Sequence, residues 1–456
     1  MRPFALALRF DYRCSVARRP RAGDWLAMQL EVASRRRRRV AGAIVGSLAA
    51  ALALAAAARL AAADGGAAAG ASPYAVESEG PFSLRALVDL RIARGSEAPS
   101  WQEGGPGKLR YGGIATAGDF ERVTRFAIAQ LALQPAVELP WGWRAQAQLN
   151  WDGDVDDRGD TSPDHDPVRL VEAFVRKDWS RDDGGTALLV GLRNPPFSLE
   201  HLGPARTPLL SLTPSALDSW LWEEGRIVGF EGQWWHSAAD APEMAAFAGA
   251  GFGPDQQGIL LARRGWVLSD FLSGVNSKLP LPGTGELANV FDERDGRPAL
   301  YAGASVTDPW KIATAHAGYS DNLGNLAVSG VWETRFGVAG VVVQPPVPLE
   351  LVVEWLYGTT TTRGAGLAST ISAVYPMISY RWRNHRVSFR YDDFSVRDDD
   401  GGPSTTESGH AFTVAYLLEI GVRHRVAVEY ATVDSDRPGV RNPGDDGWQV
   451  SYRFRY

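Results

Sequence analysis

Apolar and polar residues alternate with a period of two along much of the chain. The clearest case is the segment 448–456, and the segments 84–92 and 143–151 repeat it. Because successive side chains of a strand point to opposite faces, each segment predicts a strand with one apolar face. A stripe of the same length lies at 349–357, and shorter ones lie at 387–391 and 426–430. The chain is therefore predicted to be all-β.

The length of the stripes and their aromatic ends separate two architectures. A soluble β-sandwich has strands of about five or six residues with the apolar face inward. A transmembrane barrel has strands of about nine to eleven residues, an apolar face toward lipid and aromatic residues at both ends. The stripes here run for about nine residues, and the aromatic residues at their ends are Trp143, Trp151, Tyr357, Trp448 and Tyr456. The pattern favours a transmembrane antiparallel β-barrel, whose apolar residues are expected to coat the outside rather than form a core.

The connections between the stripes alternate in length. Short ones are expected at 139–142, 345–348, 383–385 and 421–424, and long polar ones at 94–113, 152–168, 358–370, 392–409 and 433–447. Short turns at one end and long loops at the other are typical of outer-membrane barrels. At roughly 24 residues per strand and connection, the chain suffices for about sixteen strands, which leave an aqueous channel.

The first 63 residues differ from the rest. They carry twelve Arg and three acidic residues, which leaves a net charge of −15 on residues 64–456. The arginine block 35–39, the apolar run 40–58 and the small residues 61–63 predict a cleaved secretory signal, preceded by an N-terminal extension. Translation is expected to begin at Met28. The predicted organisation is therefore 1–63 extension and signal, 64–82 short N-terminal segment, and 83–456 barrel.

The polar face of the predicted strands carries charges of both signs. The basic residues are Arg85, Arg91, Arg144, Arg390, Arg425, Arg453 and Arg455, and the acidic ones are Asp89, Glu350, Glu354, Asp392 and Glu429. Rings of one charge set the selectivity of a pore. Seven basic against five acidic residues predict a solvated lumen of mixed charge without a decisive sign.

One stretch carries a resemblance to a known family. The sequence GLRNPPFSLE at 191–200 is similar to the G-x-x-x-x-P-F-S-L-E segment of the phosphate-selective porins, and GRIVG at 225–229 is similar to that family's return strand. The resemblance implies a barrel of about sixteen strands with a constriction loop folded into the lumen. The chain lacks the lysine-rich cluster of that family, so phosphate selectivity is not carried over.

The segment between these two motifs supplies the candidate constriction. We expect its charged residues to line the pore and touch solute: Arg193, Glu200, Arg206, Glu223, Glu224 and Arg226. With Arg85, Arg91, Arg144 and Arg390 from the strands, they form the candidate site. The same segment is rich in Leu and Trp between 209 and 222, so it must pack either across the lumen or at a subunit interface.

Motifs for other chemistry are weak. No P-loop, G-x-S-x-G elbow or zinc spacing of histidines occurs, and the acidic run 152–157 does not match an EF-hand, so no cofactor and no metal site are predicted. The charge of −15 after the leader argues against nucleic acid as a partner. Two alternatives stay open: a barrel enzyme built on Ser198 with His201 or Ser408 with His410, and a secreted soluble β-protein that binds polysaccharide through exposed Trp.

Together these features predict an outer-membrane porin of a Gram-negative bacterium. It would form a water-filled channel for passive diffusion of small hydrophilic solutes, with anions among the candidates. Its expected partners are outer-membrane lipid and lipopolysaccharide. The terminal strand ending in Tyr456 resembles the signature that barrel assembly machinery reads, and the porin resemblance implies a homotrimer.

Overall fold

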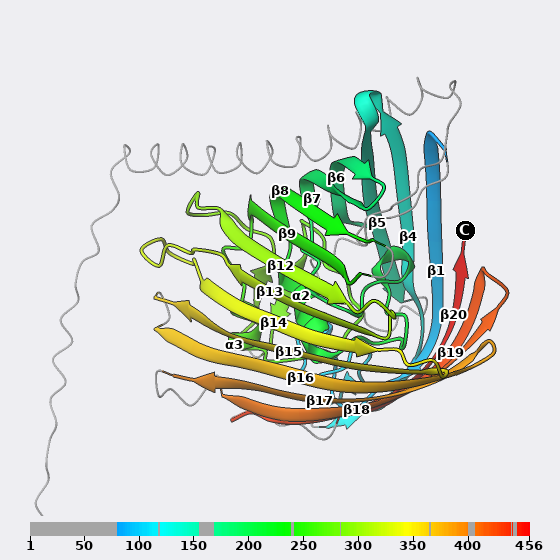
Figure 1. The fold of residues 1–456 in the computed structure, drawn as a ribbon. Coiled ribbons are helices and arrows are strands. Elements are labelled where there is room, and N and C mark those ends of the chain that lie inside the picture. The colour runs from blue at the N-terminus through cyan, green and yellow to red at the C-terminus, as the bar shows by residue number, and fades with distance from the viewer. Residues whose placement is uncertain are drawn as a thin grey trace, which may run out of the picture. The chain divides into compact units, whose positions relative to one another are not determined.

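Sixteen antiparallel strands close into a barrel in this computed structural model (Figure 1). In chain order the strands are β1 (Phe82–Arg94), β4 (Thr124–Leu139), β5 (Trp143–Asp154), β6 (Val168–Arg181), β7 (Gly184–Arg193), β8 (Ile227–His236), β9 (Glu243–Phe252), β12 (Ala299–Thr307), β13 (Ala313–Asp321), β14 (Glu333–Val343), β15 (Leu349–Thr362), β16 (Leu367–Trp382), β17 (His385–Asp398), β18 (Glu407–Ile420), β19 (His424–Asp436) and β20 (Asp445–Arg455). The predicted fold class and strand number are confirmed.

The structure describes residues 80–116, 119–154, 168–238, 241–282, 284–363, 366–399, 406–438, 440 and 445–456. The predicted extension and signal, 1–63, and most of the segment 64–82 lie outside these ranges. No helix among the described residues is both long enough and apolar enough to span a membrane.

The barrel closes where its first and last strands meet. β1 pairs with β4 on one side and with β20 on the other, with Asp89 opposite Arg453 and Ile92 opposite Val450. Beyond β20 the ladder continues, because Tyr456 and Ala86 exchange two backbone hydrogen bonds of 2.9 and 3.0 Å. Closure leaves neither of these strands with a free edge.

The two faces of the strands have the chemistry that the alternation predicts. On β15 the side chains of Val353, Trp355 and Tyr357 are almost half exposed on the outside, whereas Glu354 is fully buried on the inside. On β20, Trp448 and Tyr452 are exposed and Arg453 is buried. The outward stripe is therefore apolar and the inward stripe polar, as in a barrel that meets lipid.

The connections differ in length at the two ends of the barrel. At one end the strands are joined by short turns, such as the helical turn η2 (Pro140–Gly142) and the two-residue link 383–384. At the other end lie the long connections 95–123, 194–226 and 253–298. One predicted long loop is wrong: 358–370 is a tight link, because the threonines at 359–362 continue the ladder of β15 with β16.

The three long connections fold into the lumen, and we call them together the plug. They contain the helical turns η1 (Trp101–Glu103) and η3 (Pro204–Arg206), the helices α2 (Ala216–Glu224) and α3 (Ile259–Arg263), and the two-stranded ribbons β2–β3 (Ile114–Ala115, Phe120–Glu121) and β10–β11 (Lys278–Leu281, Glu286–Asn289). Figure 1 shows α2 enclosed by the ring of strands.

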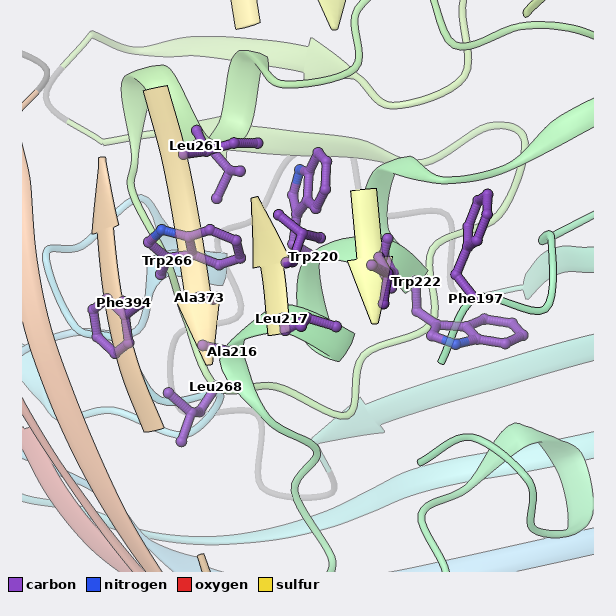
Figure 2. Packing of buried hydrophobic residues seen from close by; sticks show 14 of the residues in the cluster. Phe197, Ala216, Leu217, Trp220, Trp222, Leu261, Trp266, Leu268, Ala373 and Phe394 are labelled. Atoms are coloured by element: carbon purple, nitrogen blue, oxygen red, sulfur yellow. The ribbon is translucent and has the colours of Figure 1, made fainter. Parts of the chain in front are cut away.

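The lumen contains a hydrophobic core, which corrects the expectation that the apolar residues only coat the outside. Trp220 and Trp266 of the plug pack against inward residues of the wall, among them Phe336 and Phe394 (Figure 2). Leu356 and Phe394 share the inward face with Glu354 and Asp392. Burying such large side chains contributes roughly 1.5–3 kcal/mol each, so this core binds the plug firmly to the wall.

Candidate functional site

Helix α2 lies at the centre of the plug. Ser215 caps its N-terminus, where its hydroxyl accepts a hydrogen bond from the Asp218 amide at 3.2 Å, and Gly225 follows its last residue. Ser and Gly are favoured at these two positions because they satisfy backbone groups that a helix end leaves unpaired. All nine residues of α2 are buried. Five of these nine residues are apolar, and Leu217, Trp220 and Trp222 belong to the hydrophobic core of the lumen, which explains why 209–222 is so rich in Leu and Trp.

The segment 194–226 crosses the lumen from wall to wall. Ala205 packs on Leu87 and Ala132 of β1 and β4. Leu212 packs on Leu417 and Ala427 of β18 and β19, which lie across the barrel from β7, where the segment leaves the wall. The apolar segment therefore packs across the lumen, one of the two alternatives that the sequence left open.

Charged groups of the wall hold this segment through its backbone. Arg390 of β17 donates to the carbonyl oxygens of Thr213 and Pro214 at 2.7 and 2.8 Å, and it pairs with Glu200 at 3.2 Å. Glu429 of β19 accepts hydrogen bonds from the amides of Leu212 and Thr213. Burial raises the pKa of Glu200, although Arg390 opposes the shift. The wall thus satisfies polar groups that the plug brings into the lumen.

The end of α2 is joined to the connection 253–298. Glu223 forms an ion pair with Arg264 at 2.5 Å, and both side chains are buried. The Glu224 carboxylate accepts hydrogen bonds from the Trp220 indole and from the amides of Gly258 and Leu260. Burial raises the pKa of Glu224 to about 7, against these hydrogen bonds, which lower it.

A chain of alternating charges ties the plug to the seam of the barrel. Asp270 of the plug pairs with Arg91 of β1 at 2.5 Å and with Arg110 at 2.9 Å. Further ion pairs involve Asp89 and Asp152. Each residue pairs with the next in the order Arg453, Asp89, Arg91, Asp270, Arg110, Asp152, Arg169. The side chain of every member is at most 8% exposed. Removing one member of a buried ion pair leaves its partner uncompensated, so this chain favours a fixed plug.

A cavity of about 520 Å³ opens at the short-turn end of the lumen, and we call it the vestibule. Its lining residues are Arg85, Ala86, Leu87, Gln134, Arg193, Asn194, Pro195, Pro196, Ser198, His201, Leu202, Gly203, Pro204, Ala205, Arg206, Trp222, Val422, Arg455 and Tyr456. Four of them are arginines and none is acidic. The vestibule therefore presents hydrogen-bond donors and positive charge to anything that enters it.

The vestibule arginines are oriented by carboxylates that do not line the cavity. Arg193 pairs with Glu231 at 2.7 Å, and Arg206 pairs with Glu172 at 2.9 Å. Both carboxylates are fully buried behind the arginines. Arg206 also lies over the ring of Trp222, with 5.6 Å from its guanidinium carbon to the ring centroid. Such pairs fix the planar guanidinium groups in place.

The ten predicted site residues fall into three groups. Arg85, Arg193 and Arg206 line the vestibule. Arg144 lies on β5 and pairs with Glu138 at 3.1 Å. The remaining six are buried in contacts between plug and wall or within the plug: Arg91, Glu200, Glu223, Glu224, Arg226 and Arg390. The guanidinium of Arg226, for example, donates to the Val171 carbonyl and the Ser273 hydroxyl, both at 2.8 Å.

Arg455, His201 and Trp222 are among the vestibule residues that were not predicted as site residues. Arg455 follows the alternation of β20, so the sequence indicated its face but not its neighbours. The rings of His201 and Trp222 are in contact, with centroids 4.8 Å apart and an interplanar angle of 34°. No periodicity marks them, because they lie in the irregular part of the plug and at the end of a helix buried on all sides.

The residues named for an enzyme do not assemble a serine–histidine pair. Nδ1 of His201 is hydrogen-bonded to Asp218, but Nε2 has no hydrogen-bond partner in the described part of the chain. The Ser198 hydroxyl instead accepts a hydrogen bond from the Glu200 amide at 2.9 Å. His410 lies beside the rings of Tyr391 and Phe412.

One cluster of carboxylates has the spacing of a cation site. Asp255, Glu293 and Asp295 bring oxygen atoms within 4.8 Å of one another. These oxygens accept hydrogen bonds from backbone amides of the same loop, including those of Gly253 and Arg294. Their arrangement is explained by the folding of that loop, and we assign no metal to it.

Comparison with known proteins gives structural likeness only. No family model matches the chain, and no curated protein matches it. The anion-selective porin from Comamonas acidovorans is 15% identical, with a TM-score of 0.49, over 82% of this chain and 99% of that one. The outer membrane channel DcaP of Acinetobacter baumannii is 13% identical, with a TM-score of 0.49, over 82% and 97%.

A third solved structure, Salmonella typhi OmpF in complex with daunomycin, is 9% identical with a TM-score of 0.48, over 82% of this chain and 97% of that one. At these identities and scores the barrel rests on its own strand pairing. The resemblance of residues 191–200 to the phosphate-selective porins stays a prediction.

Proposed function

We propose that the chain is an outer-membrane channel of a Gram-negative bacterium for passive diffusion of small hydrophilic solutes. The observation that carries the proposal is the closed sixteen-stranded barrel, with apolar side chains outside and charged side chains inside. A barrel of this kind satisfies all its backbone groups in lipid, as any membrane-spanning structure must. A hydrated lumen then lowers the cost of moving a polar solute across the hydrocarbon.

The vestibule supports a preference for anions. Its wall offers the guanidinium groups of Arg85, Arg193, Arg206 and Arg455 and no Asp or Glu side chain. By the usual orientation, short turns face the periplasm, so the vestibule would be the periplasmic mouth of the channel. A mouth lined by one sign of charge raises the local concentration of the opposite ion.

The plug supports a narrow path. It fills the lumen at the level of α2, where its side chains and those of the facing wall are buried. Solutes would therefore pass only where the plug does not pack on the wall, and the plug would set the size of what passes. This gives the predicted constriction loop its role, although most of its charged residues hold the plug rather than line the vestibule.

The proposal includes partners that follow from the fold. The outward apolar stripe would contact outer-membrane lipid and lipopolysaccharide, and the strand ending in Tyr456 would be read by the barrel assembly machinery. A homotrimer is proposed on the resemblance alone.

Conductance in a planar bilayer tests the proposed function. Full-length protein, refolded in detergent and checked for heat-modifiable migration on a gel, should give discrete current steps. In a salt gradient the reversal potential should have the sign of an anion-preferring channel. Folded, membrane-inserted protein that carries no current would contradict the channel, and a cation-type reversal potential would contradict the anion preference.

A further inference from the structure

The vestibule wall combines its arginines with apolar side chains. Trp222, Leu202 and Val422 all line it, together with the ring of Tyr456. Leu202, Val422 and Tyr456 are each more than 60% exposed, so this apolar surface is open to solvent at the mouth. Arginines alone would suit any anion, but apolar side chains in a wet cavity gain free energy only when an apolar group covers them.

From this combination we propose that the vestibule binds an organic anion, in which a carboxylate is attached to an apolar or aromatic body. The inference rests on the proposed function and names the solute class of that channel. Inorganic phosphate would pair with the guanidinium groups and leave the apolar wall in water. An apolar cation would cover the wall but meet guanidinium groups where it needs carboxylates.

The arginines have donors to spare for a carboxylate. A guanidinium group has five N–H donors in a planar fork that suits a carboxylate. Arg206 uses Nε and Nη2 on Glu172, and Arg455 uses Nη2 on Glu419. Nη1 of each has no hydrogen-bond partner among the described residues, so both can donate to a ligand without breaking their own ion pairs.

The position of Arg206 joins the two kinds of surface. Its guanidinium lies over the Trp222 ring. The His201 ring also contacts Trp222, with 4.8 Å between the ring centroids. The backbone φ is positive at Arg206 (60°) and at Ala205 (52°). The turn η3 therefore holds Arg206 in a backbone conformation that residues other than glycine rarely adopt. A ligand carboxylate at Arg206 would therefore place its apolar body beside Trp222. The cavity, at about 520 Å³, has the size of small-molecule sites.

Calorimetric titration of the folded full chain in detergent tests the inference, with benzoate as the probe and inorganic phosphate and benzylamine as comparators. Benzoate should bind about tenfold or more tightly than either, since each comparator lacks one of the two kinds of contact. Arg206→Gln should weaken benzoate binding about tenfold, because it removes a charge-assisted hydrogen bond. Arg397→Gln, on the long-loop side, is the matched control and should leave the affinity unchanged.

A second variant guards against loss of folding. Leu202 is largely exposed, so Leu202→Ser should fold normally and weaken benzoate binding about threefold without changing phosphate binding. Phosphate binding as tight as benzoate, or benzoate binding unchanged by both Arg206→Gln and Leu202→Ser, would overturn the inference. Conductance without benzoate binding overturns only this inference, whereas benzoate binding by a protein that never conducts overturns the channel and leaves the site.

Discussion

The two halves of the lumen use the same residue type in different ways. In the long-loop half, Arg91 is 1% exposed and holds two aspartates of an ion-pair chain. In the short-turn half, Arg206 and Arg455 are 23% and 25% exposed, each paired with one carboxylate and open to the vestibule. Arg91 is enclosed by its two carboxylates and has a structural role, whereas Arg206 and Arg455 keep part of the guanidinium group open to the cavity.

The packing of side chains also differs between the two halves of the lumen. In the long-loop half, helix α2 and the wall form a core of Trp, Phe and Leu. In the short-turn half, a cavity of about 520 Å³ remains. We therefore expect the plug to set the electrical resistance of the proposed channel and the vestibule to set its preference for anions. Separate variants in the two halves should therefore change different properties.

The largest effect is expected from removing the helix in the long-loop half. Replacing Ala216–Glu224 by a nine-residue Gly-Ser linker should raise the single-channel conductance by a factor of about two or more, because a sixteen-stranded barrel encloses an aqueous channel. The matched control replaces the short turn 308–312 by the same kind of linker and should leave conductance unchanged. Equal conductance of both variants would contradict the assignment of the resistance to α2.

The ion-pair chain should give the next largest effect, on stability. Asp270→Asn leaves Arg91 and Arg110 partly uncompensated in a buried site and should lower the free energy of unfolding by about 3–5 kcal/mol. Asp399→Asn breaks the exposed pair with Arg397 and should cost at most about 1 kcal/mol. Urea unfolding of the detergent-folded protein measures both. Similar losses for the two variants would show that the chain does not fix the plug.

A pH dependence should follow from Glu224. Because burial raises its pKa to about 7, the folded protein keeps a proton that the unfolded chain releases near pH 4.5. The stability that protonation of Glu224 contributes is therefore fully present below pH 4.5 and is lost as the pH rises to about 7. Between pH 5 and pH 8 the wild type should lose about 2 kcal/mol more stability than Glu224→Gln. Parallel pH profiles of the two proteins would refute this role.

The smallest effect is expected in the short-turn half. The double variant Arg206→Gln, Arg455→Gln should lower the anion-to-cation permeability ratio by a factor of about two, because two of the four vestibule charges are lost. The matched double variant, Arg335→Gln with Arg397→Gln, removes two exposed charges from the long-loop side and should leave the reversal potential unchanged. A shift of the same size in both would place the selectivity outside the vestibule.

The sequence predicted the barrel because the period of two is a local property. Stripes such as 448–456 show which face of a strand is apolar, and their length and aromatic ends distinguish a lipid-facing barrel from a sandwich. The strand number followed from chain length alone. The apolar residues of the inner wall were missed, since Leu356 and Phe394 share a face with Glu354 and Asp392 and look like interruptions of a polar stripe.

The candidate site was harder to predict because it depends on neighbours distant in the chain. Glu223 and Glu224 are charged residues of the predicted constriction, but Arg264 and the amides of Gly258 and Leu260 surround them. Arg206 lines the vestibule, and its contact with solute stays a prediction. Glu223 and Glu224 differ from Arg206 because the connection 253–298 packs against α2 and buries them. The spacing of residues within 194–226 does not predict this packing.

The central claim is a channel whose short-turn mouth prefers anions, and the reversal potential of the wild-type protein in a planar bilayer tests it most directly. In a gradient of potassium chloride, a folded, heat-modifiable sample should give discrete current steps with the reversal potential displaced toward the chloride equilibrium potential. A displacement toward the potassium potential, or the absence of current from inserted protein, would contradict the account.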